Sequence, residues 1–121
     1  MQRTGIDIIE IVRIQEAVDR WGERFLQRVY TEAELRQCCQ KSPRLAIRFS
    51  GKEAVMKALG TGVKGIDWKE IEILTEPSGQ PLVHLHGKAQ KKAEELRLEQ
   101  LAISLSHSRE YAIACVVGET R

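Results

Sequence analysis

The sequence lacks the features that define several large classes of proteins. No apolar run in its 121 residues approaches the ~20 residues of a membrane-spanning helix, and acids interrupt the apolar amino-terminal stretch, which argues against a signal peptide. We therefore expect a cytoplasmic protein without membrane contact. Its three cysteines, an adjacent pair at Cys38 and Cys39 and a separate Cys115, support neither a disulfide framework nor a zinc site.

Aromatic residues and net charge are also low. Aromatics form 5% of the chain, and 19 Lys plus Arg against 17 Asp plus Glu leave a formal net charge of +2. A nucleic-acid-binding domain normally has a strong basic excess and exposed aromatic rings. We expect no nucleic-acid partner, so any electrostatic recognition has to come from local clusters of charge.

The first half of the chain is rich in helix signals. Residues 5–12 are typical of a short buried strand that passes into a helix near residue 10, and helix formers then dominate to about residue 41. Gly22 predicts a break, and Thr31 to Glu34 predicts a capping box. The principal helix is predicted over residues 44–59, with Gly60 as its left-handed end and a mobile glycine-rich loop over residues 62–65.

The second half indicates antiparallel strands. Residues 68–74 and 82–86 alternate in polarity around a turn at residues 77–81, which predicts a hairpin. A lysine-rich helix is expected over residues 87–98, followed by strands over 101–108 and 111–117. The hydrophobic share of 42% suffices for a core, so we predict one α+β domain over residues 1–121, with helices packed on a small antiparallel sheet.

The principal helix carries the most concentrated chemistry. Positions 49, 53, 57 and 60 lie on one helix face, so Glu53 and Lys57 point together toward the glycine-rich loop. A carboxylate and an ammonium beside such a loop suit an anionic, metal-bound substrate. The alternative is an ordinary surface pair, which most soluble helices carry.

Asp7 adds a second carboxylate in an unusual setting. It lies within an aliphatic segment, where a charge is unfavourable unless it is paired, hydrogen-bonded or bound to a metal. The alternative is a helix cap or a strand-end acid that faces water. Magnesium normally takes one or two protein carboxylates and completes its shell with waters and substrate phosphates. Asp7 and Glu53 supply that number.

Three motifs together resemble a known family. They are Gly5-Ile6-Asp7-Ile8, Arg48-Phe49-x-x-Lys52-Glu53-Ala54-x-x-Lys57-Ala58-x-Gly60-Thr61-Gly62, and Ser104-Leu105-Ser106-His107-Ser108. In this order and spacing they resemble holo-acyl-carrier-protein synthase, the small bacterial class of 4'-phosphopantetheinyl transferases, over essentially the whole chain. One departure is Ser50-Gly51, where the family usually has small residues such as alanine. A glycine inside a helix costs ~1 kcal/mol relative to alanine, which predicts a locally softer helix.

The resemblance implies an activity and a set of roles. The phosphopantetheine arm of coenzyme A would move to a serine of an apo acyl carrier protein, with release of 3',5'-ADP, in support of fatty acid biosynthesis. Asp7 and Glu53 would bind Mg²⁺, and Glu53 or a water that it holds would accept the serine proton. Coenzyme A would contact Lys57, Arg48, Gly60 and His107. The family likeness also implies a homotrimer with active sites at subunit junctions.

An arginine series suggests a surface for an acidic carrier protein. Arg13, Arg20, Arg24 and Arg28 are seven, four and four residues apart and would form one stripe on a continuous helix. The resemblance favours the first three as carrier contacts. The alternative is a mixed, solvated face, because four acids share the same stretch and Gly22 interrupts it.

Other candidates are weaker. His84 and His86 have no third ligand at a suitable spacing, so we interpret them as a structural pair, and Cys115 is expected to be a buried small hydrophobe. The competing function is a non-catalytic coenzyme A or nucleotide-binding module, which would not need both Asp7 and Glu53.

Overall fold

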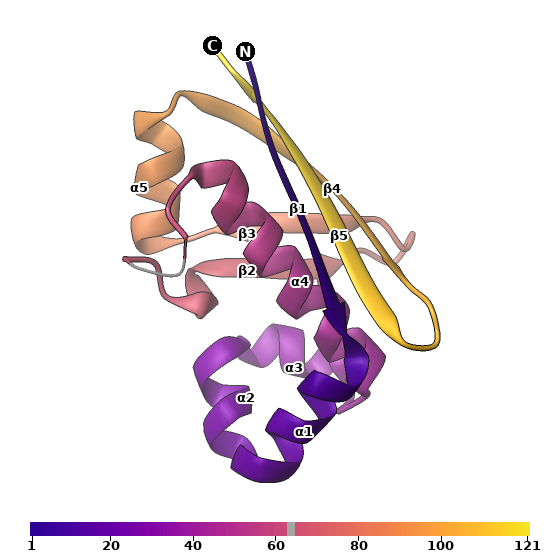
Figure 1. Cartoon of the computed structure of the whole chain (residues 1–121). Helices are drawn as coiled ribbons and strands as arrows, with labels where there is room; N and C mark the ends of the chain where they lie inside the picture. The colour runs from indigo at the N-terminus through magenta and orange to yellow at the C-terminus, as the bar shows by residue number, and fades with distance from the viewer. Residues whose placement is uncertain (63–64) are drawn as a thin grey trace.

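The structure, a computed structural model, describes residues 1–62 and 65–121 and confirms an α+β fold (Figure 1). The predicted glycine-rich loop lies partly outside the described residues. In chain order the elements are β1 (Gln2–Glu10), α1 (Ile11–Trp21), α2 (Glu23–Val29), α3 (Glu32–Cys38), α4 (Ser42–Leu59), the 3-10 turn η1 (Trp68–Glu70), β2 (Ile71–Thr75), β3 (Pro81–Leu85), α5 (Gly87–Glu95), β4 (Leu98–His107) and β5 (Tyr111–Thr120).

The main sheet has the strand order β1-β5-β4, and both strand pairs are antiparallel. Strands β2 and β3 form a separate hairpin, as the turn at residues 77–81 predicts. Figure 1 shows α1, α2 and α3 gathered at one end of the molecule, with α5 and the β2–β3 hairpin beside α4. The two chain ends lie together, and the Thr120 amide donates to the Met1 carbonyl at 2.9 Å.

Helix α4 packs across the inner face of the main sheet. Its contact with β1 is so close at Gly5 that an added Cβ atom would lie 1.9 Å from the carbonyl oxygen of Ala54. Because side chains alternate along a strand, Asp7 lies on the same face of β1 as Gly5 and points toward α4. The packing of a glycine against the helix therefore brings a carboxylate beside it.

Local signals set the helix ends. Gly22 has φ = 55° between α1 and α2, and Gly60 ends α4 with φ = 75°, a region that favours glycine. The capping box at the start of α3 is complete, because Thr31 accepts from the Glu34 amide and Glu34 accepts from the Thr31 amide. These predictions are confirmed.

Three expectations about the second half need correction. Residues 68–70 form a 3-10 turn, so the strand begins only at Ile71, and α5 ends at Glu95 rather than at residue 98. Cys115 is exposed rather than buried, because it pairs with Ile6 on the outer face of the sheet. Strand β5 carries apolar residues on both of its faces, so an apolar neighbourhood in its sequence does not mean burial.

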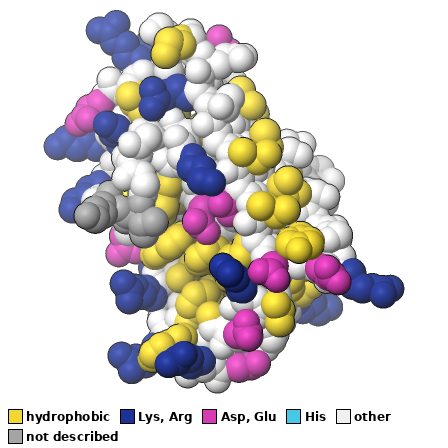
Figure 2. All heavy atoms as spheres, in the orientation of Figure 1, with side chains coloured by type: hydrophobic (Ala, Val, Ile, Leu, Met, Phe, Trp, Pro, Cys, Tyr) yellow, Lys and Arg dark blue, Asp and Glu magenta, His cyan; other side chains and the backbone are white. Residues whose placement is uncertain are grey.

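Apolar side chains cover the outer face of the main sheet. Ile6 and Ile8 are 59% and 60% exposed on β1, and their partners Cys115 and Ile113 are also exposed. A row of hydrophobic side chains is visible along this side of the molecule (Figure 2). Among the described helices none is both long and apolar enough to cross a membrane.

Gly51 packs closely against the core in the middle of α4. A Cβ atom there would lie 2.5 Å from Ile73 Cδ1 and 3.3 Å from Leu105 Cδ2. The helix runs without interruption from Ser42 to Leu59. Glycine at this position therefore allows β2 to approach α4 closely. Helix propensity alone predicted a locally softer helix, whereas the structure gives Gly51 a role in packing.

Candidate active site

Asp7 and Lys57 meet where β1 crosses α4. Lys57 Nζ donates to Asp7 Oδ1 at 3.2 Å and to the Ile6 carbonyl at 2.9 Å. The Lys57 side chain is 55% exposed, whereas that of Asp7 is only 12% exposed. The lysine head can therefore reach a ligand in solvent while the carboxylate stays at the edge of the core.

The second oxygen of Asp7 has no partner of its own. Among the described residues, Asp7 Oδ2 is the one buried side-chain oxygen or nitrogen that makes no hydrogen bond. An unpaired carboxylate oxygen that is excluded from water is unfavourable. A bound cation is one way to satisfy it.

Glu53 faces the same region from one turn earlier on α4. Its pKa is raised, first by burial and then by the negative charge of Asp7, while Lys57 acts in the opposite direction. Burial and the Asp7 charge both disfavour the ionised form of Glu53, and an added positive charge would favour it. The site therefore has two carboxylates and one ammonium in close proximity, as the sequence predicts.

The chemistry of these donors fits magnesium. Two carboxylates, one with an unsatisfied oxygen, match the one or two protein ligands that Mg²⁺ usually takes beside waters and substrate phosphates. Within residues 1–62 and 65–121 no group of three or more His, Cys, Asp or Glu side chains is placed to hold a metal. His86 instead pairs with Glu72, with 3.1 Å between Nε2 and Oε1.

Arg3 adds a cation that the sequence analysis missed. Its Nε donates to the Ala58 carbonyl at 2.7 Å, and a Cβ on Gly60 would lie 2.9 Å from Arg3 Nη2. Arg3 thus lies at the carboxyl end of α4 beside Gly60, one of the predicted coenzyme A contacts. The alternation that puts Gly5 and Asp7 on the inner face of β1 also puts Arg3 there, so the signal was present.

Arg48, another predicted coenzyme A contact, is held between α4 and β2. Its side chain is buried, and its Nε donates to the Ile73 carbonyl at 3.1 Å. Its Nη2 donates to Gln37 Oε1 at 2.9 Å and to Thr75 Oγ1 at 3.1 Å. Within one chain Arg48 joins α4 to β2 through these bonds, and its contact with coenzyme A stays a prediction.

His107 lies apart from the carboxylates of its own chain. The strand register aligns Asp7 with Ala114 and Leu105, so His107 is two strands away and two residues further along. Strand geometry puts the two Cα atoms ~12 Å apart. His107 is exposed beside the β4–β5 turn, where its Nδ1 lies 3.2 Å from the Ser108 carbonyl.

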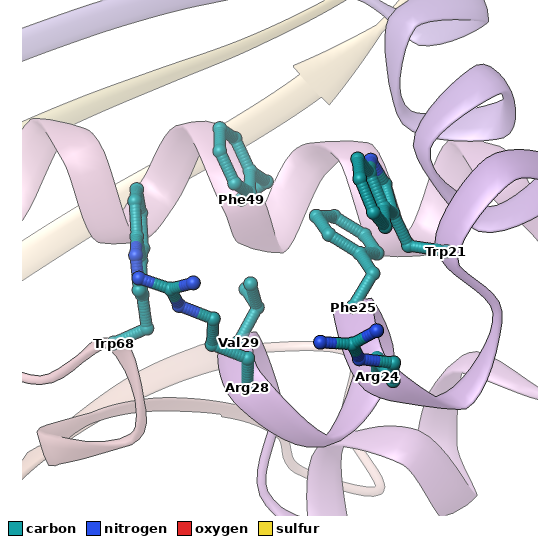
Figure 3. A pocket seen from close by; sticks show the side chains of 7 residues that line it. All are labelled: Trp21, Arg24, Phe25, Arg28, Val29, Phe49 and Trp68. Carbon is teal, nitrogen blue, oxygen red and sulfur yellow. The ribbon is translucent and has the colours of Figure 1, made fainter.

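An aromatic pocket of about 490 Å³ lies between α2, α4 and η1, and sequence reasoning did not predict it (Figure 3). Phe49, one turn before Glu53 on α4, stacks on Trp68 with 4.7 Å between ring centroids. Arg24 and Arg28, one helical turn apart on α2, flank the rings. The lining residues are Trp21, Arg24, Phe25, Arg28, Val29, Phe49 and Trp68.

The arginine series does not form one continuous stripe. Gly22 ends α1, so Arg13 and Arg20 belong to α1 while Arg24 and Arg28 belong to α2. Arg13 pairs with Glu10 at 3.4 Å. The Arg20 guanidinium lies 5.0 Å from the centroid of the Trp21 ring. Only the two arginines of α2 line the aromatic pocket.

Comparison with known proteins identifies the class. A family model described as the 4'-phosphopantetheinyl transferase superfamily matches residues 3–116, and the chain belongs to this superfamily. Holo-acyl-carrier-protein synthase from Herpetosiphon aurantiacus is 51% identical, over 95% of this chain and 96% of the relative. The synthase from Dehalococcoides mccartyi is 54% identical, over 98% of this chain and 99% of the relative.

Solved structures agree in fold. Holo-acyl-carrier-protein synthase from Helicobacter pylori in complex with coenzyme A has a TM-score of 0.87 and 36% identity, covering 96% of this chain and 99% of that chain. The Neisseria meningitidis enzyme has a TM-score of 0.89 and 31% identity, covering 98% of both chains. The family resemblance drawn from the three sequence motifs is confirmed.

Proposed function

We propose that this chain transfers the 4'-phosphopantetheine arm of coenzyme A to a serine of an apo acyl carrier protein, with 3',5'-ADP as the second product. The observation that carries the proposal is the unsatisfied Asp7 Oδ2 beside Glu53 and Lys57, on a chain whose relatives are holo-acyl-carrier-protein synthases. A non-catalytic binding module would not need both carboxylates. The order and spacing of the three motifs in this sequence support the same assignment.

Asp7 and Glu53 are the residues that would hold Mg²⁺, and Asp7 Oδ2 has the free coordination position. When bound, the metal neutralises charge on the diphosphate that is cleaved. Lys57 then contacts the diphosphate and stabilises the negative charge that develops on the leaving 3',5'-ADP. Its exposed Nζ can move to the substrate because its present acceptors are a backbone carbonyl and Asp7.

Glu53 also serves the proton transfer. The serine hydroxyl of the carrier loses a proton as its oxygen attacks the phosphorus, and Glu53 accepts this proton directly or through a water that it holds. The raised pKa of Glu53 brings it closer to neutral pH than an exposed carboxyl group, which strengthens it as a base. Direct acceptance and acceptance through water remain two forms of the same proposal.

Assembly into a homotrimer belongs to the proposal. Support comes from the exposed apolar face formed by Ile6, Ile8 and Ile113, which a second copy would bury. His107 lies ~12 Å from Asp7 within one chain, as the strand spacing gives. At a subunit junction, His107 of one copy would reach the coenzyme A bound at Asp7 and Lys57 of another. Gly60 contributes backbone contacts at the end of α4.

A cytoplasmic location is also proposed. The three cysteines are free, and two of them, Cys39 and Cys115, are exposed. Exposed unpaired thiols are typical of a reducing compartment. Burial raises the pKa of Cys38 to about 11, so that thiol stays protonated at neutral pH.

Product stoichiometry tests the transferase assignment. Incubation with apo carrier, coenzyme A and Mg²⁺ should release one 3',5'-ADP for each carrier serine modified, as measured by chromatography and carrier mass. A carrier whose acceptor serine is replaced by alanine should give neither product. Binding of coenzyme A without release of 3',5'-ADP would favour the binding-module alternative.

We infer that the carrier docks across α1 and α2. Arg13, Arg20 and Arg24 offer positive charge to an acidic partner, and the aromatic pocket beside Arg24 offers an apolar anchor point. Interfaces of this kind combine buried aromatic groups with charged rims. Rim charges mainly accelerate association and respond strongly to salt.

We expect Arg24→Glu to raise the KM for carrier ~10-fold or more at low salt, because it reverses a charge beside the pocket. The KM for coenzyme A should change by less than twofold. The matched control is Arg36→Glu, an exposed arginine on α3 that lies outside the pocket. Steady-state kinetics at two salt concentrations measure both constants. An equal loss in the two variants would contradict docking at α2.

A further inference from the structure

An ion pair without solvent exposure lies behind Glu53, on the side of α4 that faces β2. Lys52 Nζ is 2.8 Å from Glu34 Oε1, and both side chains are 0% exposed. The same ammonium donates to the carbonyls of Trp68 at 2.9 Å and Ile71 at 2.5 Å. Each of its three protons therefore has an acceptor.

The Glu34 carboxylate is equally well satisfied. Besides Lys52, Oε1 accepts from the Thr31 amide at 2.9 Å, and Oε2 accepts from the Ile73 amide at 2.9 Å. One carboxylate thus joins the start of α3, the middle of α4 and strand β2. A buried ion pair is favourable only when its hydrogen bonds are this complete, and even then it is a weak source of stability.

Neighbouring residues hold the same turn of α4 against β2. Gly51 allows the close approach of Ile73, and Arg48 donates to the Ile73 carbonyl at 3.1 Å. Successive residues of a helix point ~100° apart, so a turn whose Lys52 is fixed toward β2 has Glu53 fixed toward a different side. That side faces Asp7, because Lys57, one turn after Glu53 on the same helix face, donates to Asp7 Oδ1 at 3.2 Å.

We propose that Glu34 and Lys52 are positioning residues for the transfer reaction. Their ion pair sets the rotation and axial position of the α4 turn that carries Glu53, so that its carboxylate meets Asp7 in a geometry that binds the metal. The inference rests on the proposed function, because it assigns a purpose to the pair only if Glu53 is a metal ligand. Apolar residues in the same space would pack the helix without setting its rotation through directed hydrogen bonds.

The test measures metal binding directly. Glu34→Gln keeps the size of the side chain but removes its charge and places an amide donor among the Lys52 and Ile73 donors. We expect Mg²⁺ to bind the variant–coenzyme A complex ~10-fold more weakly by calorimetry, the effect typical of lost support behind a metal ligand. The Mg²⁺ concentration for half-maximal transfer should rise by a similar factor.

Two further variants separate positioning from general destabilisation. Ala89→Gly weakens α5 at a buried core position, and α5 makes none of the hydrogen bonds of the Glu34–Lys52 pair, so the variant should have a lower melting temperature while Mg²⁺ affinity stays within twofold of wild type. Glu34→Asp retains the charge of the pair and should recover part of the affinity. If circular dichroism shows that Glu34→Gln does not fold, Glu34→Asp becomes the test of the inference. We then expect its Mg²⁺ affinity to be at least threefold lower than that of wild type, because the shorter side chain cannot reach both Lys52 and Ile73.

The outcomes distinguish this inference from the proposed function. If wild type binds no Mg²⁺ with coenzyme A and transfers nothing, the proposed function fails. If wild type does both, and a folded Glu34 variant binds Mg²⁺ within twofold of it, the positioning role is overturned. The same holds if Ala89→Gly weakens Mg²⁺ binding as much as the Glu34 variants do.

Discussion

Glu53→Gln is expected to lower the transfer rate by ~10²–10⁴, the contribution typical of a positioned proton acceptor, while the protein remains folded. The change removes the charge that would help hold Mg²⁺ and the group that accepts the serine proton. Stopped assays of carrier modification under saturating substrates measure the loss. The matched control is Glu76→Gln, an exposed acid in the β2–β3 turn, which should keep the wild-type rate.

The same substitution should raise the melting temperature of the metal-free protein at neutral pH. The pKa of Glu53 is raised in the folded state, so above that pKa the ionised carboxylate lowers the free energy of unfolding. This penalty disappears as the pH falls through the raised pKa, and the advantage of glutamine should shrink with it. A Glu53→Gln variant that kept its activity would contradict the assignment. So would a variant whose melting temperature was lower than that of wild type by the same amount at neutral and at acidic pH.

Gly5→Ala is expected to destabilise the protein by ~3 kcal/mol, at the upper end of the usual cost of overpacking. The added Cβ atom would lie 1.9 Å from the Ala54 carbonyl oxygen and 3.0 Å from the Ala58 amide nitrogen. Both obstacles are backbone atoms of α4, so no side chain can rotate away, and β1 has to separate from the helix. Urea unfolding measures the loss.

This separation should also damage the site, because Asp7 lies two residues after Gly5 on the same strand face. We expect the folded fraction of Gly5→Ala to bind Mg²⁺ more weakly than wild type. Gln90→Ala, at an exposed position of α5, is the control and should change the free energy of unfolding by less than ~0.5 kcal/mol, as exposed positions usually do. Equal stability of the two variants would mean that β1 and α4 are not in such close contact.

The carboxylate site could be predicted because its signals are local. An acid inside an aliphatic strand and a carboxylate one turn before a lysine are visible within a few residues of sequence. The helix ends at Gly22 and Gly60 were predictable for the same reason, since a positive φ selects glycine at the position itself. Close contact between Asp7 and Lys57 then follows from the crossing of β1 and α4.

The burial of charged residues was not predictable in this way. Arg48 and Lys52 lie on a helix rich in polar residues, and their acceptors are backbone carbonyls of η1 and β2 that come 16 to 25 residues later in the chain. Nothing within α4 indicates which of its cations will meet those carbonyls. The exposure of Cys115 was missed because β5 is apolar on both faces, so the sequence pattern did not indicate which face is turned toward the core.

The dependence of transfer on the metal tests the central claim most directly. The carrier should gain one phosphopantetheine mass in the presence of coenzyme A and Mg²⁺, lose this gain when a chelator removes the metal, and recover it when excess Mg²⁺ is restored. Asp7→Asn should show at most a small fraction of the gain under all three conditions. An unchanged mass gain in the presence of chelator, or a fully active Asp7→Asn variant, would contradict the account.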